Sequence, residues 1–232
     1  MEGNDLLVDR PRDGVLRLRL NRPERRNALD AALVAALSEA LAREAARVVL
    51  LCSASAGCFC SGADLKLDDR ARAMVSDALY ALYGQMRRLE APIVCALSGP
   101  AVGGGAQLAI ASDLRVADPS AWLRFVGPGH GLAVGAWRLP RLIGEGRAVD
   151  LCLTGRRVPA DEARAIGLVD RVGDDAVETG LALASQLAAL DAGAVARVKA
   201  LTGVASDLRA LELQAAGNRP WNGAVPAHGR PA

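Results

Sequence analysis

Two glycine-rich stretches constrain the fold of this chain more than any other feature. The segments 59–65 (FCSGADL) and 98–107 (SGPAVGGGAQ) each follow an apolar run, 48–52 and 93–97, with the composition of a buried strand. Each leads into a segment with helical spacing. This order leaves backbone N–H groups unpaired at the start of a helix, where the helix dipole is positive. Two such turns side by side could hold one oxygen atom between two amides, as an oxyanion hole does.

The glycine run 103–105 has several interpretations. A run of glycines before a helix often marks only a close approach of backbones or a residue with positive φ. The G-x-G-x-x-G spacing of dinucleotide-binding proteins is absent, and no acidic residue follows where a ribose contact would require it. A phosphate-binding loop is excluded because no Gly-Lys-Ser/Thr occurs, and the only lysines are Lys66 and Lys199. Close packing and oxyanion binding are the interpretations left open.

Further motifs accompany the glycine turns. In chain order they are NRPERRNAL (21–29), GADL (62–65), the GGG helix start with SDLRVA (112–117), LTGRRVPADEA (153–163) and GLV (167–169). With this order and spacing, residues 5–173 resemble the crotonase family, that is, the enoyl-CoA hydratase/isomerase superfamily. The resemblance rests on the whole set of motifs, since any one alone is a weak signal.

The resemblance and the order of predicted elements indicate an α/β, crotonase-like (ClpP/crotonase) spiral of ββα units with C-terminal helices. The pattern predicts strands at 6–9, 15–20, 48–52, 93–97 and 114–117, and helices at 30–45, 71–89, 103–112, 176–190 and 192–215. We expect the spiral core in 1–173 and a C-terminal helical region in 174–217. The end of the chain, 218–232, is rich in proline and glycine, so we expect a loose tail there.

The resemblance also implies roles for residues of both turns. The backbone N–H groups of Ala63 and Gly104 are the implied oxyanion hole for a thioester oxygen. The implied coenzyme A contacts are Arg25, Arg26, Ala28, Ala63, Asp64 and Leu65, and an arginine fork suits phosphate. Solvated loop charge is an equally good interpretation of either arginine, and the expected task of Asp64 is to tie down its turn.

The two glutamates that hydratases of this family use are missing from their expected positions. The first position, three residues beyond the middle glycine, is Gln107, and an amide cannot accept a proton at neutral pH. The second falls on Gly127 or on Arg124, depending on the end from which it is counted. His130 is the nearest titratable group in sequence and could act as acid or base, although a histidine in a Gly/Pro loop is more often a surface or packing residue.

Composition narrows the class of protein. With 28 Lys and Arg against 26 Asp and Glu, and basic residues scattered along the chain, nucleic-acid binding has no support. No apolar run is long enough for a membrane span and no leader pattern opens the chain, so we expect a cytoplasmic protein without a membrane partner. The cysteines are interpreted as buried small hydrophobes. Cys58 and Cys60 do not complete a metal site, and a nucleophilic Cys60 is the alternative.

Three functions from different classes are consistent with these residues. The first is an enzyme that binds an acyl-CoA thioester and stabilises its enolate in the two-amide oxyanion hole, for hydration, isomerisation or decarboxylation. It would need no metal and no cofactor besides the thioester substrate, and the usual two-glutamate hydration is not expected of it. The second is an inert acyl-CoA binder that has lost both glutamates, and the third is a structural oligomer whose glycines serve only packing. We expect the first, as a homotrimer or a dimer of trimers by resemblance.

Overall fold

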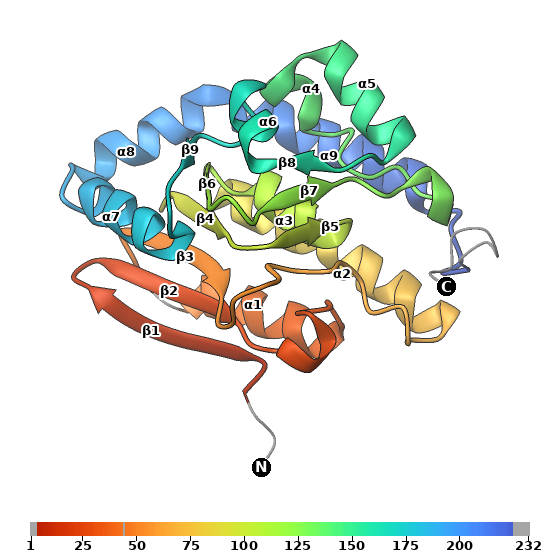
Figure 1. Cartoon of the computed structure of the whole chain (residues 1–232), viewed down its shortest axis with the longest axis horizontal. Helices are drawn as coiled ribbons and strands as arrows, with labels where there is room; N and C mark the ends of the chain where they lie inside the picture. Colours follow the sequence, from red (N-terminus) through yellow and green to blue (C-terminus); the bar gives the residue numbers. More distant parts are fainter. Residues whose placement is uncertain (1–3, 44, 225–232) are drawn as a thin grey trace.

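A computed structural model describes residues 4–43 and 45–224 (Figure 1). Within them the strands form a sheet of order β1-β2-β3-β4-β6-β9 and a smaller sheet of order β5-β7-β8. The strands are β1 (Leu6–Arg12), β2 (Val15–Leu20), β3 (Val48–Ser53), β4 (Ile93–Leu97), β5 (Pro100–Val102), β6 (Leu114–Ala117), β7 (Trp122–Arg124), β8 (Val158–Pro159) and β9 (Arg171–Val172). The β1–β2 and β7–β8 pairs are antiparallel, and the other pairs are parallel.

Helices cover both faces of the larger sheet. In chain order they are α1 (Ala31–Arg43), α2 (Asp69–Arg88), α3 (Gly104–Ala111), α4 (Leu139–Ile143), α5 (Glu145–Thr154), α6 (Ala160–Ala165), α7 (Ala176–Ala188), α8 (Ala192–Lys199) and α9 (Ala205–Asn218). Short turns of helix are η1 (Pro23–Arg25), η2 (Pro128–His130) and η3 (Ala200–Val204). Helix α7 packs on β3, β4 and β6, whereas α2 packs against α1, α3 and α9. In Figure 1, α4, α5 and α6 lie together at the top of the view.

The central strands are buried on both faces, which explains their uninterrupted apolar sequences. Every residue of β3 and β4 is buried. Successive side chains of a strand point to opposite faces. On β3, Val49 and Leu51 therefore join the main core with residues of α1, α2 and α3, while Leu50 and Cys52 join a second core under α7. The two glycine turns leave this sheet at the carboxyl ends of β3 and β4, so the rigid sheet positions both of them.

The α/β class predicted from the sequence is confirmed, and two features differ from the prediction. The helix expected over 192–215 is interrupted at Thr202 and Gly203, where the φ of Gly203 is 110°, so α8 and α9 are separate helices. The smaller sheet was not predicted. Its strands β5, β7 and β8 have three, three and two residues, which is too short for a periodic pattern to show.

The structure describes residues 218–224 of the segment 218–232, where we expect a loose tail. Asn218 is the last residue of α9, and its carbonyl accepts the N–H of Trp221 at 2.9 Å. Arg72 Nε of α2 donates to Gly223 O at 2.8 Å. Residues 219–224 therefore pack against α2, and residues 225–232 of the predicted tail lie outside the described residues.

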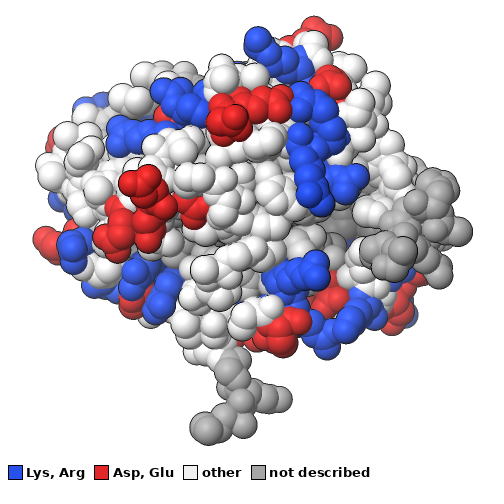
Figure 2. Space-filling model, viewed as in Figure 1, with Lys and Arg blue, Asp and Glu red and all other residues white. Residues whose placement is uncertain are grey.

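Acidic and basic side chains are mixed over the surface. Figure 2 shows both signs interspersed on one face, with basic side chains gathered above and below a hollow at its right-hand side. In the described part of the chain, no single helix has the length and apolar composition to cross a membrane. One pair of helical segments meets that test only when the two are taken together; they are Ala176–Ala188 and Ala192–Asn218, and they are bent by 112° at the break between them.

Candidate active site

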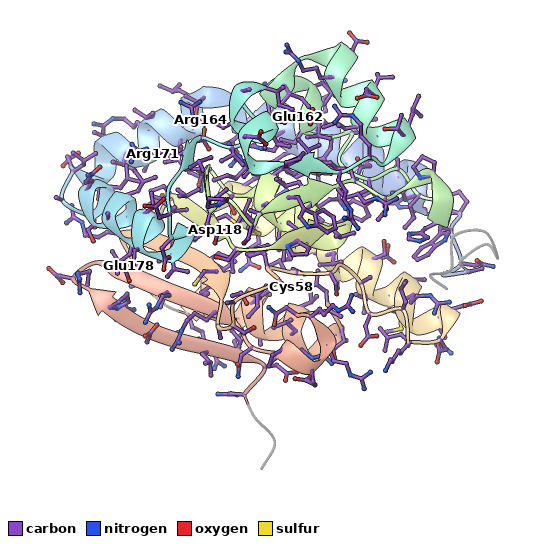
Figure 3. The ribbon with its side chains drawn as sticks, in the orientation of Figure 1. Cys58, Asp118, Glu162, Arg164, Arg171 and Glu178 are labelled. Carbon is purple, nitrogen blue, oxygen red and sulfur yellow. The ribbon has the colours of Figure 1, made fainter. Side chains whose placement is uncertain are left out.

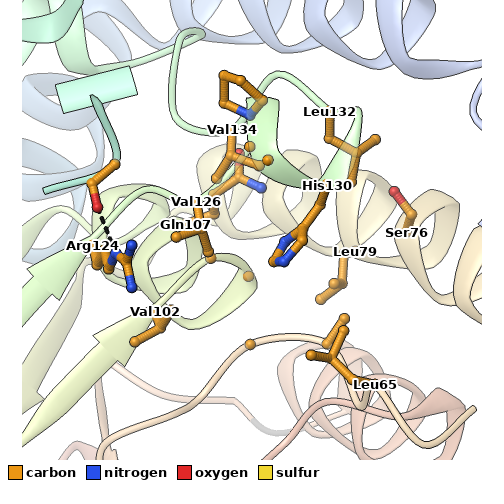
Figure 4. Close-up of a pocket in the computed structure, with 18 of the residues that line it drawn as sticks. Leu65, Ser76, Leu79, Val102, Gln107, Arg124, Val126, His130, Leu132 and Val134 are labelled. Atoms are coloured by element: carbon orange, nitrogen blue, oxygen red, sulfur yellow. Dashed lines mark hydrogen bonds between the residues drawn. The ribbon is translucent and has the colours of Figure 1, made fainter. Parts of the chain in front are cut away.

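A cavity of about 440 Å³ lies where the two glycine turns meet (Figure 4). Both turns line it, together with α2, residues of the segment 124–134, residues 153–155 and Trp221, which follows α9. The structure brings together five residues that the sequence singled out, and all of them line this cavity: Ala63, Leu65, Gly104, Gln107 and His130. Segments far apart in the sequence thus build one site.

The N–H of Ala63 is directed away from Leu29, to which the first glycine turn is hydrogen-bonded. Leu29 N donates to Gly62 O at 2.8 Å, and Asp64 N donates to Leu29 O at 2.9 Å. These two hydrogen bonds form a parallel bridge between Leu29 and Ala63, and they involve the carbonyl of Gly62 and the N–H of Asp64. In this pattern the N–H of Ala63 itself points to the side opposite Leu29. The Ala63 N–H is therefore left for the cavity that Ala63 lines.

The N–H of Gly104 is unpaired for a different reason. Gly104 is the first residue of α3, so its amide has no partner within the helix. The preceding Gly103, with a φ of 51°, has no side chain to cap the helix, and its carbonyl accepts Gln107 N instead. The Tyr83 hydroxyl donates to Gly104 O at 3.0 Å and fixes this end of the helix. A Cβ on Gly62 would lie 3.4 Å from Gly104 N, so the two turns are in contact.

Gln107 presents its NH₂ group, and not its oxygen, to the cavity. Its Oε1 accepts hydrogen bonds from Gly135 N at 3.1 Å and from Gln214 Nε2 at 2.9 Å. A backbone N–H can only donate, so the amide atom that faces Gly135 must be the oxygen. Gln107 is therefore a hydrogen-bond donor toward the cavity, which a glutamate at the same position would not be.

Two further side-chain amides, those of Gln214 and Asn218, belong to a hydrogen-bond network that connects Gln107 with Tyr80. Gln214 Oε1 accepts from Trp137 N at 3.0 Å, and Asn218 Oδ1 accepts from Ala133 N at 2.9 Å, so both orientations are fixed by backbone donors. Their NH₂ groups donate to the Tyr80 hydroxyl at 3.2 and 2.5 Å. Burial raises the pKa of Tyr80, and hydrogen bonds from the neighbouring amides offset this only in part. Tyr80 therefore keeps its proton at neutral pH.

The sequence did not predict this amide network. Tyr80 lies on α2, and Gln214 and Asn218 lie on α9. Tyr80 and Gln214 were predicted as helical, Asn218 was placed in the loose tail, and none of the three was assigned a chemical task. Gln107 and Gln214 are 107 positions apart in the chain. A local pattern carries no signal for such a pair. Through this network, side chains of α9 fix the orientation of Gln107 in the cavity wall.

Replacing Gln214 with leucine should lower the free energy of unfolding by about 1–3 kcal/mol, because Trp137 N would be buried without an acceptor and Gln107 would lose one donor. Urea unfolding measures this. Gln186→Leu on the exposed face of α7 makes the same chemical change outside the network and should be nearly neutral. Equal effects of the two substitutions would contradict a supporting role for Gln214.

His130 lies on η2, and its imidazole points into the cavity (Figure 4). Arg124 and Gly127, the two alternatives for the second glutamate position, line the cavity as well. Among the described residues that line the cavity there is no Asp or Glu. Three acids labelled in Figure 3 lie outside it, Asp118, Glu162 and Glu178.

The predicted coenzyme A contacts divide into three groups. Ala63 and Leu65 line the cavity, as stated above. Arg25 and Arg26 are exposed and do not line it, but Ser61 of the cavity wall donates its N–H to Arg26 O at 3.0 Å, so both lie beside the rim. Ala28 and Asp64 are buried. Asp64 Oδ1 accepts from Lys66 N at 3.0 Å, which ties down the turn as expected.

Cys60 is positioned as a packing residue. It is fully buried, it does not line the cavity, and its thiol donates to Asn27 O at 3.1 Å. Burial raises the pKa of Cys60 to about 12, so it is a thiol and not a thiolate at neutral pH. Cys58 is half-buried in the loop after β3 (Figure 3). The nucleophilic alternative for Cys60 therefore finds no support in this geometry.

Solved structures share this architecture. A monofunctional enoyl-CoA isomerase from M. smegmatis has a TM-score of 0.75 at 34% identity, and the match covers 90% of this chain and 98% of that one. An enoyl-CoA hydratase from Bacillus anthracis has a TM-score of 0.80 at 33% identity, with 92% and 90% covered. The fold is therefore the crotonase fold that the sequence motifs predicted.

Sequence comparison identifies the family. The family profile of enoyl-CoA hydratase/isomerase matches residues 10–225. A protein of Mycobacterium bovis named probable enoyl-CoA hydratase is 40% identical over 189 residues, which are 72% of this chain and 65% of that protein. The mouse mitochondrial enoyl-CoA hydratase domain-containing protein 2 is 38% identical, over 76% of this chain and 66% of its own length. The chain belongs to the enoyl-CoA hydratase/isomerase family, and its match spans just under two thirds of these relatives.

Proposed function

We propose that this protein is an enzyme that binds an acyl-CoA thioester with its carbonyl oxygen between the N–H groups of Ala63 and Gly104. The observation that carries the proposal is the pair of unpaired amides on two glycine turns in contact at one cavity. The thioester oxygen gains negative charge when an α-proton leaves, when water adds at the β-carbon, or when carbon dioxide is lost. Aimed N–H donors stabilise that charge, and one donor is worth about 3 kcal/mol of barrier.

Proton transfer at this site falls to groups other than carboxylates. The imidazole of His130 faces the cavity and is the group placed to carry a proton, and the half-buried Tyr80 hydroxyl receives two amide donors. Gln107 offers N–H donors, which can position a water or a substrate oxygen but cannot take a proton. Isomerisation and decarboxylation require less of Gln107 than hydration does, so they are the reactions that this set of residues supports best.

The remainder of the thioester would extend past the rim. Arg25 and Arg26 lie beside Ser61 there, and the basic side chains around the hollow in Figure 2 suit the phosphates of coenzyme A. The reaction as proposed uses no metal and no cofactor besides the thioester. A homotrimer or dimer of trimers is part of the proposal, and large apolar side chains that are exposed on α9 and the preceding turn support an interface, with Leu201 85% and Leu213 69% exposed.

Mass spectrometry of CoA thioesters incubated with excess protein tests the function. The panel contains an α,β-enoyl, a β,γ-enoyl and a malonyl thioester, each in deuterated water and in water labelled with heavy oxygen. We expect solvent deuterium at the α-carbon, movement of a double bond, or loss of carbon dioxide. The His130→Asn variant is the matched comparison, since it removes the base and leaves both amides in place.

Each outcome separates the candidate functions. Gain of a labelled water would show hydration without the two glutamates, and its loss in His130→Asn would assign the proton transfer to His130. An unchanged panel together with tight binding of the thioesters would identify the inert binder, for which the absence of lining carboxylates is the supporting observation. An unchanged panel without binding would contradict both and leave the glycines as packing residues.

A further inference from the structure

Arg124 lies directly beside the second glycine turn. It is the last residue of β7, and it stands opposite Val102 of β5 in the parallel pair. Its carbonyl accepts the N–H of Gly103 at 2.9 Å. Adjacent strands lie about 4.8 Å apart, so the base of the Arg124 side chain is a near neighbour of the residue that precedes Gly104.

The guanidinium of Arg124 has no acid as partner within the described residues. Arg124 is half-buried and lines the cavity, and its Nε donates to Gly155 O (Figure 4). The other lining arginine, Arg72, differs because it pairs with Asp69 and donates to backbone carbonyls of the first turn and the tail. The terminal nitrogens of Arg124 are thus a fork of N–H donors with no acceptor among the residues that the structure describes, at a wall where no described lining residue is acidic.

We propose that the acyl group of the substrate carries a carboxylate of its own, and that Arg124 binds it. This inference rests on the proposed function and narrows its substrate class to carboxyacyl-CoA thioesters. A planar guanidinium matches a carboxylate with two parallel hydrogen bonds, and the pair is stronger in a partly dry cavity than in water. Partial removal of water from the Arg124 guanidinium costs free energy unless a bound anion compensates for it. Arg124 therefore disfavours the binding of a fully apolar acyl chain.

The position of Arg124 favours the acyl end of the ligand over the phosphates of coenzyme A. Arg124 adjoins Gly103, next to the amide that holds the thioester oxygen under the proposed function. The arginines suited to phosphate, Arg25 and Arg26, adjoin Ser61 at the rim. A carboxylate on the acyl chain lies within reach of the thioester, whereas the phosphates lie beyond the long pantetheine arm.

Calorimetric titration with succinyl-CoA and butyryl-CoA tests the inference. The two thioesters have acyl groups of equal carbon number and differ in the terminal carboxylate. We expect the wild-type protein to bind succinyl-CoA roughly 10- to 100-fold more tightly, the range given by a hydrogen bond to a charged group. Arg124→Met should abolish this preference by weakening succinyl-CoA without weakening butyryl-CoA, and Arg124→Lys should keep a part of it, because the charge remains and the fork is lost.

The control is Arg43→Met, which removes an exposed arginine on α1 outside the cavity and should leave both affinities unchanged. Thermal unfolding and the affinity for butyryl-CoA report whether Arg124→Met still folds around the site. Equal affinities of the wild-type protein for the two thioesters would overturn the inference and leave the proposed function intact. If Arg124→Met weakened the binding of succinyl-CoA and butyryl-CoA equally, the inference would be overturned, and Arg124 would instead contact the phosphates that the two thioesters share. Failure of the wild-type protein to bind either thioester would overturn the proposed function and this inference together.

Discussion

Replacing Asp207 with alanine should lower the free energy of unfolding by about 3–5 kcal/mol, the cost of removing one partner from a buried ion pair. The side chain of Asp207 is 2% exposed and lies on α9. It pairs with Arg138, with Arg87 at 3.3 Å and with Arg141 at 3.3 Å. Arg87 and Arg138 are themselves buried. Without Asp207, Arg138 would keep no carboxylate partner among the described residues, and Arg87 would keep only Asp113.

The surrounding cluster cannot compensate for the loss. Its other carboxylate, Asp113, already pairs with Arg87 at 2.6 Å and with Lys199 at 2.8 Å. Cations outnumber carboxylates in this cluster. Burial lowers the pKa of Arg138 to about 10, and burial also lowers the pKa of Lys199. Because α9 also carries Gln214, loosening this cluster should disturb the amide network behind the cavity.

Urea unfolding with a matched variant measures the effect. Glu212→Ala removes an exposed carboxylate from the same helix and should change stability by less than about 0.5 kcal/mol. Adding Arg138→Met to Asp207→Ala removes the cation that the first substitution leaves without a carboxylate, and it should restore part of the loss. A cost below about 1 kcal/mol for Asp207→Ala would show that water reaches the cluster and that the pairs are weak.

Local patterns in the sequence account for the larger sheet and for both glycine turns. The strands at 93–97 and 114–117 were predicted with the bounds that the structure shows. Their signal is strong because a parallel strand covered on both faces is apolar throughout. The choice of the Ala63 and Gly104 amides came from the family resemblance. A helix start leaves its first N–H groups without a partner in the helix, which accounts for Gly104, whereas the direction of the Ala63 N–H depends on the bridge to Leu29.

The ion pairs and hydrogen bonds that hold the site in place could not be predicted from local sequence patterns. Arg138 and Asp207 are 69 positions apart, and each looks like an ordinary surface charge on its own helix or turn. The orientation of Gln107 depends on Gly135 N and on Gln214, both distant in the chain. The sequence could show that a glutamate is missing at position 107. It could not show that the amide there is held as a donor, nor that Arg124 faces the same cavity without an acid.

Replacing Gly104 with proline should lower kcat/KM by about 10²–10³, because the substitution deletes one of the two N–H donors proposed to hold the thioester oxygen. The backbone tolerates proline there. Gly104 is the first residue of α3, where proline is favoured, and Gln107 N donates to Gly103 O without using the Gly104 amide. A side chain at this position would meet Leu29 Cδ1 at 3.1 Å and Leu79 Cδ1 at 3.3 Å, and both are movable ends of leucines.

Gly104→Ala is the control for the added Cβ, because it places a carbon at the same position and keeps the N–H. It should retain activity within a few-fold, and the two variants should unfold at similar temperatures. A second readout does not depend on turnover: the proline variant should lose affinity for a CoA thioester but not for the corresponding thioether, which has no carbonyl oxygen. If proline and alanine have the same effect on both measurements, the Gly104 amide does not bind the oxygen. The contact between the turns would then serve packing, since the added Cβ is common to both variants and the missing hydrogen is not.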